Sequence, residues 1–122
     1  MADTTTLIDT YLSAYGETDA DRRLVLIRQS FAADGSLTDP PFAATGHEEL
    51  HGAFAAVQSQ FPGHRFRRAS GIDEHHGVAR YRWDLVAPDG AVTLSGMDIV
   101  TIVDGNIRQV VGFFEPLPAL NA

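Results

Sequence analysis

The stretch GVARYRWDLVAPDGAVTLSGMDIVTIVDGNIRQVVGFFE, residues 77–115, decides the fold. Apolar and charged residues alternate in its first part, which is typical of a strand with one buried face and one exposed face. Two Asp-Gly pairs separate the apolar runs, and Asp-Gly between such runs is a strong signal for a hairpin turn. The stretch therefore predicts three antiparallel strands that are joined by two tight turns.

Asp98 lies on an apolar face of the middle predicted strand. The two-residue period of a strand places it on the same face as Val100 and Ile102. Removal of a carboxyl group from water raises its pKa, so the group can stay neutral and donate a hydrogen bond. Asp98 is therefore a candidate site residue. The alternative is that it caps or bonds a neighbouring backbone group.

Three helices are predicted before these strands. Apolar residues recur at helical spacing from about residue 4 to residue 15. Thr18 is expected to cap a second helix, in which Phe31 is the last residue that faces inward. Thr45 and Glu48 match the T-x-x-E capping box, and they predict the start of a third helix.

Two further strands complete the predicted order. One is short, at about residues 36–39, and it ends at Asp39 before a Pro-Pro turn. The other spans about residues 64–72. Helices come first and strands last, without the alternation that a parallel sheet requires, so the fold class is α+β with a sheet curled over a helical layer. A chain of 122 residues predicts one domain, residues 1–122.

The composition excludes several kinds of chemistry. The chain has no Cys, and all nine of its basic residues are Arg, so thiolate nucleophiles, disulfides and lysine Schiff bases are excluded. A formal charge of −7 opposes binding to nucleic acid and to anionic membranes. No apolar run is as long as a membrane span requires, and the first residues do not resemble a secretion signal. We therefore expect a cytoplasmic protein.

Four motifs, in this order, carry a resemblance to a known family. The chain resembles the SnoaL-like and ketosteroid-isomerase-like branch of the nuclear transport factor 2 superfamily. The resemblance implies a cone in which three N-terminal helices pack on a curved antiparallel sheet and enclose a pocket for a small molecule. The motifs are LIDTYLSAY (7–15), FAADGSLTDP (31–40), ATGHEEL (44–50) and GMDIVTIVDGNI (96–107).

The resemblance also implies roles for three residues. In the isomerases of this superfamily, residues at the positions of Tyr11 and Asp98 donate hydrogen bonds to an enolate oxygen. The residue at the position of Asp39 carries the proton. In the polyketide cyclases, the aspartate at the position of Asp98 is instead the acid and base of an aldol closure. The implied function is isomerisation or cyclisation of a small apolar or polyketide-like carbonyl compound, without cofactor or metal.

An enclosed, mostly apolar pocket is expected around these three residues. We predict that Phe54, Trp83, Gly112 and Phe114 form its ligand-binding walls. Proteins of one fold can lose an activity and keep the architecture, because function depends on the site. A ligand-binding or scaffold module without catalysis therefore remains the alternative to an enzyme.

The opposite face of the predicted sheet keeps several apolar residues. They are Met97, Ile99, Val111 and Phe113. Contiguous apolar surface of this kind marks an interface with another protein. We therefore predict a homodimer that forms through the outer face of the sheet.

Two other patterns carry weaker predictions. HEELH, residues 47–51, matches the H-E-x-x-H motif of zinc proteases, but His47 falls in the first helical turn, whereas that motif holds both ligands in mid-helix. Arg82 and Asp84 loosely suggest the Arg/Asp pairing of an epoxide hydrolase. Strand alternation points both away from the core, and Gly112 stands where a second aspartate is needed. We therefore rank zinc binding and epoxide hydrolysis below the isomerase or cyclase function.

Overall fold

The computed structural model describes residues 3–121. The three predicted helices are present, and seven strands follow or separate them. The elements are α1 (Thr4–Gly16), α2 (Ala20–Ser30), β1 (Phe31–Asp39), β2 (Phe42–Thr45), α3 (His47–Gln60), β3 (Arg65–Arg68), β4 (Asp73–His75), β5 (Val78–Val86), β6 (Val92–Val103) and β7 (Asn106–Phe114).

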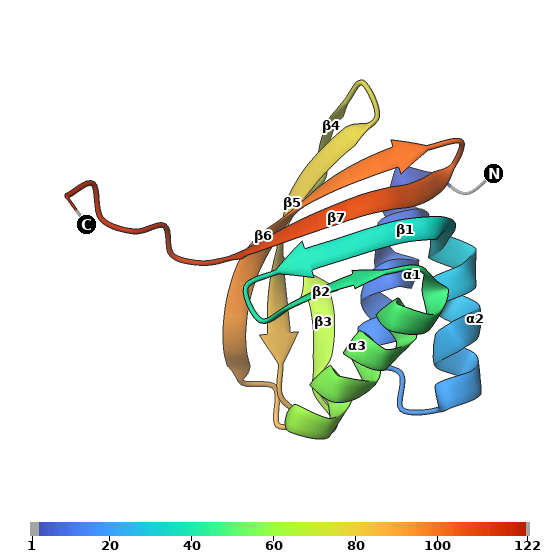
Figure 1. Ribbon diagram of the computed structural model, residues 1–122. Coiled ribbons are helices and arrows are strands. Elements are labelled where there is room, and N and C mark those ends of the chain that lie inside the picture. The colour runs from blue at the N-terminus through green and yellow to red at the C-terminus, as the bar shows by residue number, and fades with distance from the viewer. Residues whose placement is uncertain (1–2, 122) are drawn as a thin grey trace.

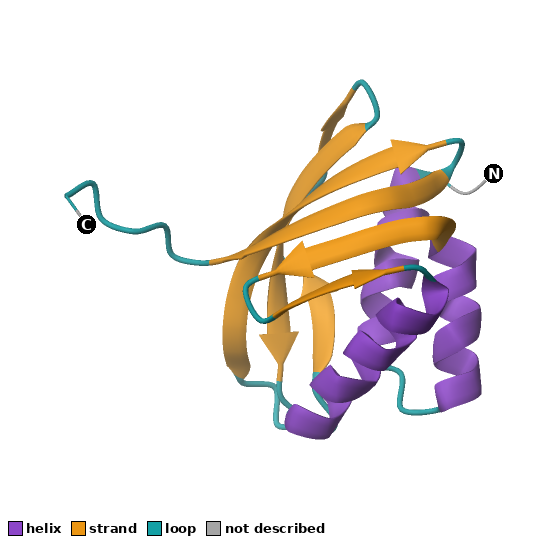
Figure 2. Ribbon diagram, viewed as in Figure 1, coloured by secondary structure: helices purple, strands orange, loops and turns teal. Residues whose placement is uncertain are grey.

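The strands form one curved sheet, and the three helices cover one of its faces (Figures 1 and 2). The strand order is β2-β1-β7-β6-β5-β3, and β4 pairs with the remaining part of β5. All pairings are antiparallel except the one between β1 and β7, which is parallel. The architecture is therefore α+β, with a helical layer packed inside an open, curved sheet.

The predicted meander of β5, β6 and β7 is confirmed. Both tight turns contain glycines with positive φ, +91° at Gly90 and +79° at Gly105, a conformation that glycine adopts without a steric penalty. The predicted inner face of β5 is also confirmed, because Ala79, Tyr81 and Trp83 are all buried. Side chains of this row pack against the helices and form one wall of the core.

Three local predictions about the helices were wrong. Phe31 is the first residue of β1, where its amide still closes the last turn of α2. The cap of α2 is Asp19, whose carboxylate accepts from two amides of the first turn, so Thr18 is not the cap. Thr45 and Glu48 form no capping box. Instead Gly46 is in the N-cap position of α3, and the Thr45 amide donates to the carboxylate of Glu49 at 3.0 Å.

Two strand predictions also needed correction. The strand expected at residues 36–39 begins at Phe31, and a register shift before Ser36 bends it. The strand expected at residues 64–72 covers only residues 65–68, as β3. The short strand β4, residues 73–75, lies beyond the predicted strand, and β3 and β4 pair with opposite ends of β5. The strand β2 was not predicted. It pairs back onto β1 directly after the Pro-Pro turn, so this turn closes a hairpin.

The core lies between the helices and the concave face of the sheet. Its fully buried large side chains include Tyr11 from α1, Phe54 from α3 and Tyr81 from β5. None of the helices within residues 3–121 is both long enough and apolar enough to cross a membrane. The cytoplasmic location stays a prediction.

Candidate functional site

A cavity of about 270 Å³ lies between the concave face of the sheet and the helices α1 and α3. Its walls are mostly apolar, and its polar side chains come from five elements. From here on, "the cavity" means this space. Its lining residues that carry polar groups are Tyr11, Tyr15, Asp39, Gln60, Trp83 and Asp98.

Asp98 on β6 is buried in the wall of the cavity and accepts three hydrogen bonds. The hydroxyl of Tyr81 donates to its Oδ2 at 2.7 Å, and the hydroxyl of Tyr11 donates to the same atom at 3.3 Å. The indole Nε1 of Trp83 donates to Oδ1 at 3.1 Å. Burial raises the pKa of Asp98 to about 6, although these three donors act in the opposite direction.

Asp39 occupies the last position of β1, where the Pro-Pro turn begins. Its Oδ1 is buried and has no hydrogen-bond partner within the described part of the chain. Burial raises the pKa of this carboxyl to about 6, and a hydrogen bond from the Phe42 backbone offsets part of the shift. An unpaired buried carboxylate oxygen is costly, so Asp39 is ready to accept a proton or a hydrogen bond from a ligand.

Gly112 on β7 holds the two carboxyl groups close together. A Cβ atom added at this position would lie 3.1 Å from the Cβ of Asp39 and 3.2 Å from the Oδ1 of Asp98. The negative charge of Asp39 also raises the pKa of Asp98, after the larger effect of burial. The missing side chain of Gly112 therefore lets two acidic groups from different strands share one cavity.

Three buried tyrosines lie near Asp39 and Asp98. Burial raises the pKa of Tyr11, Tyr15 and Tyr81 well above the usual value, with a further contribution from the charge of Asp98 or Asp39. They are therefore neutral hydrogen-bond donors at physiological pH. Tyr15 and Tyr81 were not predicted as site residues. The hairpin register could have identified Tyr81, because it pairs directly with Asp98 across β5 and β6.

Six of the seven predicted pocket residues line the cavity, and the exception is Phe54. The six are Tyr11, Asp39, Trp83, Asp98, Gly112 and Phe114. Phe54 is fully buried behind the wall, where its ring packs against Tyr15 with centroids 3.9 Å apart. Placing Phe54 on the wall was wrong, because the helical stripe identifies the buried face of α3 but not which of its residues meets empty space.

The two histidines of the HEELH motif make structural hydrogen bonds. The Nε2 of His47 lies 3.0 Å from the Phe31 carbonyl oxygen, and the Nε2 of His51 lies 2.9 Å from that of Ala20. A carbonyl oxygen can only accept, so each imidazole donates here. The two side chains tie α3 to α2 and to the start of β1.

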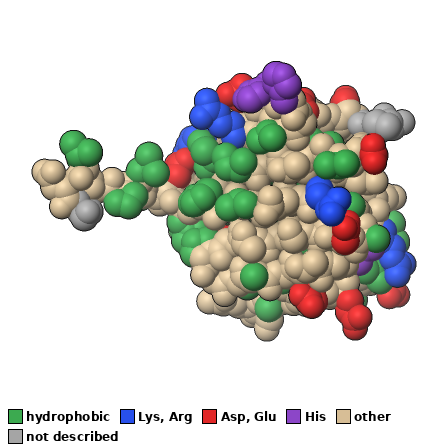
Figure 3. All heavy atoms as spheres, turned by 45° about the horizontal axis from the view of Figure 1, so that its top comes forward, with side chains coloured by type: hydrophobic (Ala, Val, Ile, Leu, Met, Phe, Trp, Pro, Cys, Tyr) green, Lys and Arg blue, Asp and Glu red, His purple; other side chains and the backbone are tan. Residues whose placement is uncertain are grey.

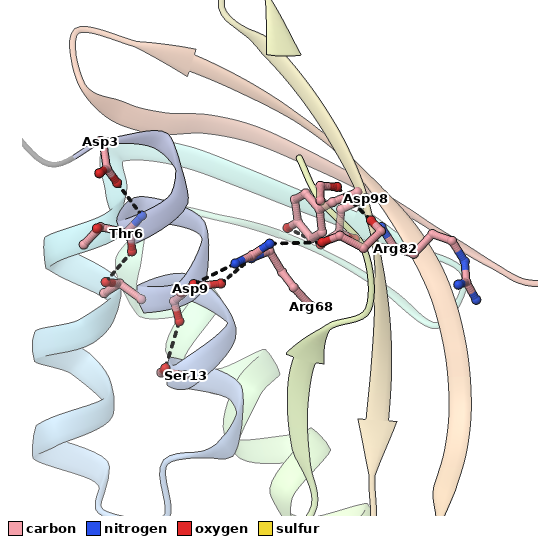
Figure 4. A network of polar contacts seen from close by, with 11 residues as sticks. Asp3, Thr6, Asp9, Ser13, Arg68, Arg82 and Asp98 are labelled. Atoms are coloured by element: carbon pink, nitrogen blue, oxygen red, sulfur yellow. Dashed lines mark hydrogen bonds and ion pairs between the residues drawn. The ribbon is translucent and has the colours of Figure 1, made fainter. Parts of the chain in front are cut away.

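Arg82 and Asp84 lie outside the cavity, as strand alternation predicted. Arg82 forms an ion pair with Glu115 at 2.8 Å, and Asp84 pairs with Arg67 at 3.2 Å. Arg68 also pairs outside the cavity, where it reaches from β3 to Asp9 on α1 (Figure 4). These ion pairs join elements to one another and leave the cavity without a basic group.

Residues 8–110 match a protein family described as a SnoaL-like domain. No curated protein matches the chain. A solved structure from Agrobacterium tumefaciens str. C58, provisionally named an isomerase of the SnoaL-like family, is 34% identical to this chain. The two align with a TM-score of 0.86 over 92% of this chain and 97% of that chain.

Two more distant solved structures share the fold. A hypothetical protein from Catenulispora acidiphila DSM 44928, with a ketosteroid isomerase-like fold and in complex with trimethylamine, has a TM-score of 0.74 at 13% identity, covering 93% of this chain and 88% of that chain. A protein from Sinorhizobium meliloti, provisionally named a polyketide cyclase, has a TM-score of 0.66 at 16% identity, covering 88% of this chain and 93% of that chain.

Proposed function

Because the chain belongs to the SnoaL-like domain family, we propose that it is a cofactor-independent enzyme that moves a proton next to a carbonyl group. The reaction is isomerisation, or cyclisation of a polyketide-like substrate, in the cavity. The names given to the A. tumefaciens and S. meliloti proteins are consistent with these two reactions. The observation that carries the proposal is that Asp39 and Asp98 line one cavity.

Asp39 acts as the base in this proposal. Its Oδ1 has no partner among residues 3–121, and a pKa of about 6 leaves the carboxyl mostly ionised near neutral pH while keeping it a stronger base than an exposed aspartate. The proton is taken from the carbon next to the substrate carbonyl. Apolar residues around the reacting atoms, among them Trp83 and Phe114, bind the frame of the substrate and exclude water.

Asp98 and Tyr11 act as donors to the substrate oxygen. Asp98 can donate only in its protonated form, and a pKa of about 6 makes that form available near neutral pH. Tyr11 donates to Asp98 over 3.3 Å, which is a long bond, so its hydroxyl can turn to a closer acceptor. The active form of the pair thus holds one proton, with Asp39 ionised and Asp98 protonated.

The alternative function is a ligand-binding module without catalysis. Tyr11, Tyr81 and Trp83 already donate to Asp98, which a purely structural acceptor would also require. The C. acidiphila protein, with the same fold, was solved with a bound small molecule. In this alternative the cavity binds its ligand and no proton moves.

Deuterium exchange decides between the enzyme and the binding module. Cyclohexanone in heavy water is followed by NMR for exchange of the hydrogens next to its carbonyl. We expect the protein to accelerate exchange, and Asp39→Asn to reduce this acceleration by about 100-fold or more, the usual contribution of a general base. Asp34→Asn is the matched control, because it removes one carboxylate from an exposed ion pair with Arg108. No acceleration, or equal acceleration by Asp39→Asn, would favour the binding module.

We also propose that the protein is a homodimer that forms through the outer face of the sheet. Phe113 is 54% exposed on this face, next to the half-buried Met97, Ile99 and Val111. Hydrophobic side chains gather on the surface beside the root of the C-terminal segment (Figure 3). The segment leaves β7 and extends away from the body (Figure 1), with Leu117 and Leu120 almost fully exposed. A second copy would cover both the face and the segment.

A further inference from the structure

The cavity contains two acidic groups and no basic group among the described residues that line it. Asp39 and Asp98 are its two lining side chains that ionise near neutral pH. The other polar groups are the hydroxyls of Tyr11 and Tyr15, the amide of Gln60 and the indole N–H of Trp83, all of which are neutral. Any ligand in the cavity therefore lies beside two acidic groups and meets no compensating positive charge.

The arginines are held elsewhere by their own partners. Six of them form ion pairs with acidic residues outside the cavity. Arg23 is buried, but its guanidinium donates to the backbone carbonyls of Glu17 and Thr18. The remaining two, Arg28 and Arg65, are exposed. No arginine is thus placed to neutralise the negative charge of Asp39 and Asp98. That charge can be neutralised by a proton or by a cationic ligand.

The carboxylate oxygens of Asp39 and Asp98 can accept more hydrogen bonds than they do. Among the described residues, the Oδ1 of Asp39 is buried without a partner, and the Oδ1 of Asp98 accepts one hydrogen bond, from Trp83. The Oδ1 of Asp98 and the Cβ of Asp39 both lie beside the space that a Gly112 side chain would fill. A carboxylate oxygen accepts more than one hydrogen bond, so this part of the cavity is suited to a ligand group that carries several N–H donors.

Aromatic rings form much of the remaining wall. The indole of Trp83 meets Phe66 at 5.2 Å and Phe114 at 6.2 Å between ring centroids, and both contacts are close to perpendicular. The rings of Tyr15, Phe42 and Phe61 line the cavity as well. The faces of aromatic rings attract cations, and the attraction is largest where water is excluded.

From these features we infer that the cavity takes a small organic cation, such as a protonated amine on an apolar frame. The inference deepens the proposed function, and it rests on that proposal in taking the cavity as the substrate site. The substrate of the proton transfer is then an amino-substituted carbonyl compound. Carboxylates, phosphates and other anions are rejected, because they would lie beside two carboxyl groups without a counter-charge.

Calorimetric titration with three molecules of one shape tests the inference. The probes are cyclohexylmethylamine, cyclohexylmethanol and cyclohexanecarboxylate, which are cationic, neutral and anionic near neutral pH. We expect the amine to bind at least about tenfold more tightly than the alcohol, and the carboxylate to bind most weakly. Equal affinity for the amine and the alcohol, tighter binding of the carboxylate, or no binding of any probe at millimolar concentration would overturn the inference.

Variants locate the source of the preference. Asp39→Asn should reduce the preference for the amine over the alcohol by about tenfold. Asp34→Asn, which changes the net charge equally but outside the cavity, should leave the preference intact. If Asp34→Asn has the same effect as Asp39→Asn, the preference belongs to the net charge, and the inference fails.

The two proposals can fail separately. Exchange of cyclohexanone requires no positive charge on the ligand, so acid–base activity without amine preference would overturn only the inference. If the protein prefers the amine over the alcohol but does not accelerate exchange of cyclohexanone, the inference about the ligand stands and the proposed proton transfer is contradicted. The ranking of the three probes by the unmodified protein is decisive even if Asp39→Asn does not fold.

Discussion

At the scale of single residues, Asp98 is subject to two opposing effects. Burial disfavours its ionised form, whereas the Tyr11, Tyr81 and Trp83 donors favour it. Burial is the larger effect, and the pKa is raised to about 6. The carboxyl is therefore easier to protonate in the folded protein than in the unfolded chain. This difference links the chemistry of the site to the stability of the fold.

Replacing Asp98 by Asn should flatten the dependence of stability on pH. An aspartate with a raised folded pKa contributes most to stability in its protonated form, below about pH 4, and this contribution is lost as the pH rises through about 6. Asn does not ionise. As the pH rises from about 4 to about 6, the free energy of unfolding of the parent protein should therefore fall, relative to that of Asp98→Asn, by on the order of 2 kcal/mol.

Urea denaturation at a series of pH values measures this difference. Asp34→Asn is again the control, because it removes one exposed carboxyl group outside the cavity. A parent protein that gains stability over Asp98→Asn as the pH rises would show that Asp98 has a depressed pKa and a structural role.

At the scale of elements, the site depends on close contact between β5, β6 and β7. Gly96 pairs with Trp83 on one side and with Phe114 on the other. A Cβ atom at Gly96 would overlap the Trp83 indole and the Phe113 carbonyl oxygen. The absence of a side chain thus lets the indole lie flat over β6 and reach Asp98, two residues farther along the same strand.

Gly96→Ala should displace Trp83 and destabilise the protein. Forcing a methyl group into a filled core costs about 1–3 kcal/mol, and the indole would lose its bond to Asp98. Trp83 is the one tryptophan of the chain, so its fluorescence reports the displacement directly. Gly52→Ala is the matched control, because its Cβ would meet no atom within 4 Å and alanine favours the helix. An unchanged spectrum and stability in Gly96→Ala would contradict the described contact.

The sequence predicted the elements better than the details of the site. Strand alternation and the Asp-Gly turns are local signals, so the meander and the inner position of Asp98 could be read directly. The partners of Asp98 are set by pairing between strands and by helix packing. Tyr81 was therefore missed, and Phe54 was wrongly placed on the wall. Asp39 was assigned through resemblance alone, since an Asp before Pro is also an ordinary turn residue.

At the scale of the whole molecule, the two faces of the sheet differ in what they present. The concave face, closed by α1 and α3, holds the cavity, and the outer face keeps partly exposed apolar residues. Phe114 lines the cavity and its neighbour Phe113 lies on the outer face, because successive side chains of a strand point to opposite faces. An interface on the outer face would hold β7 in place, and with it Gly112 in the wall of the cavity.

Phe113→Asp should convert the proposed dimer into a monomer. A charge at the centre of an apolar interface costs several kcal/mol when it has no partner, which is enough to separate two copies at micromolar concentration. Val25→Asp is the control, because Val25 is similarly exposed, at 48%, but lies on α2. Sedimentation velocity should give twice the chain mass of 13.2 kDa for the parent protein and for Val25→Asp. A parent protein that sediments as a monomer would remove the dimer.

The central claim is that Asp39 and Asp98 form one acidic pair in which the pKa of both carboxyl groups is raised to about 6. Site-resolved NMR titration of the side-chain carboxyl carbons tests it most directly. The pair should titrate in coupled steps near pH 6, well above the usual aspartate value of 3.8. A pKa at or below 3.8 for either member of the pair would contradict the claim.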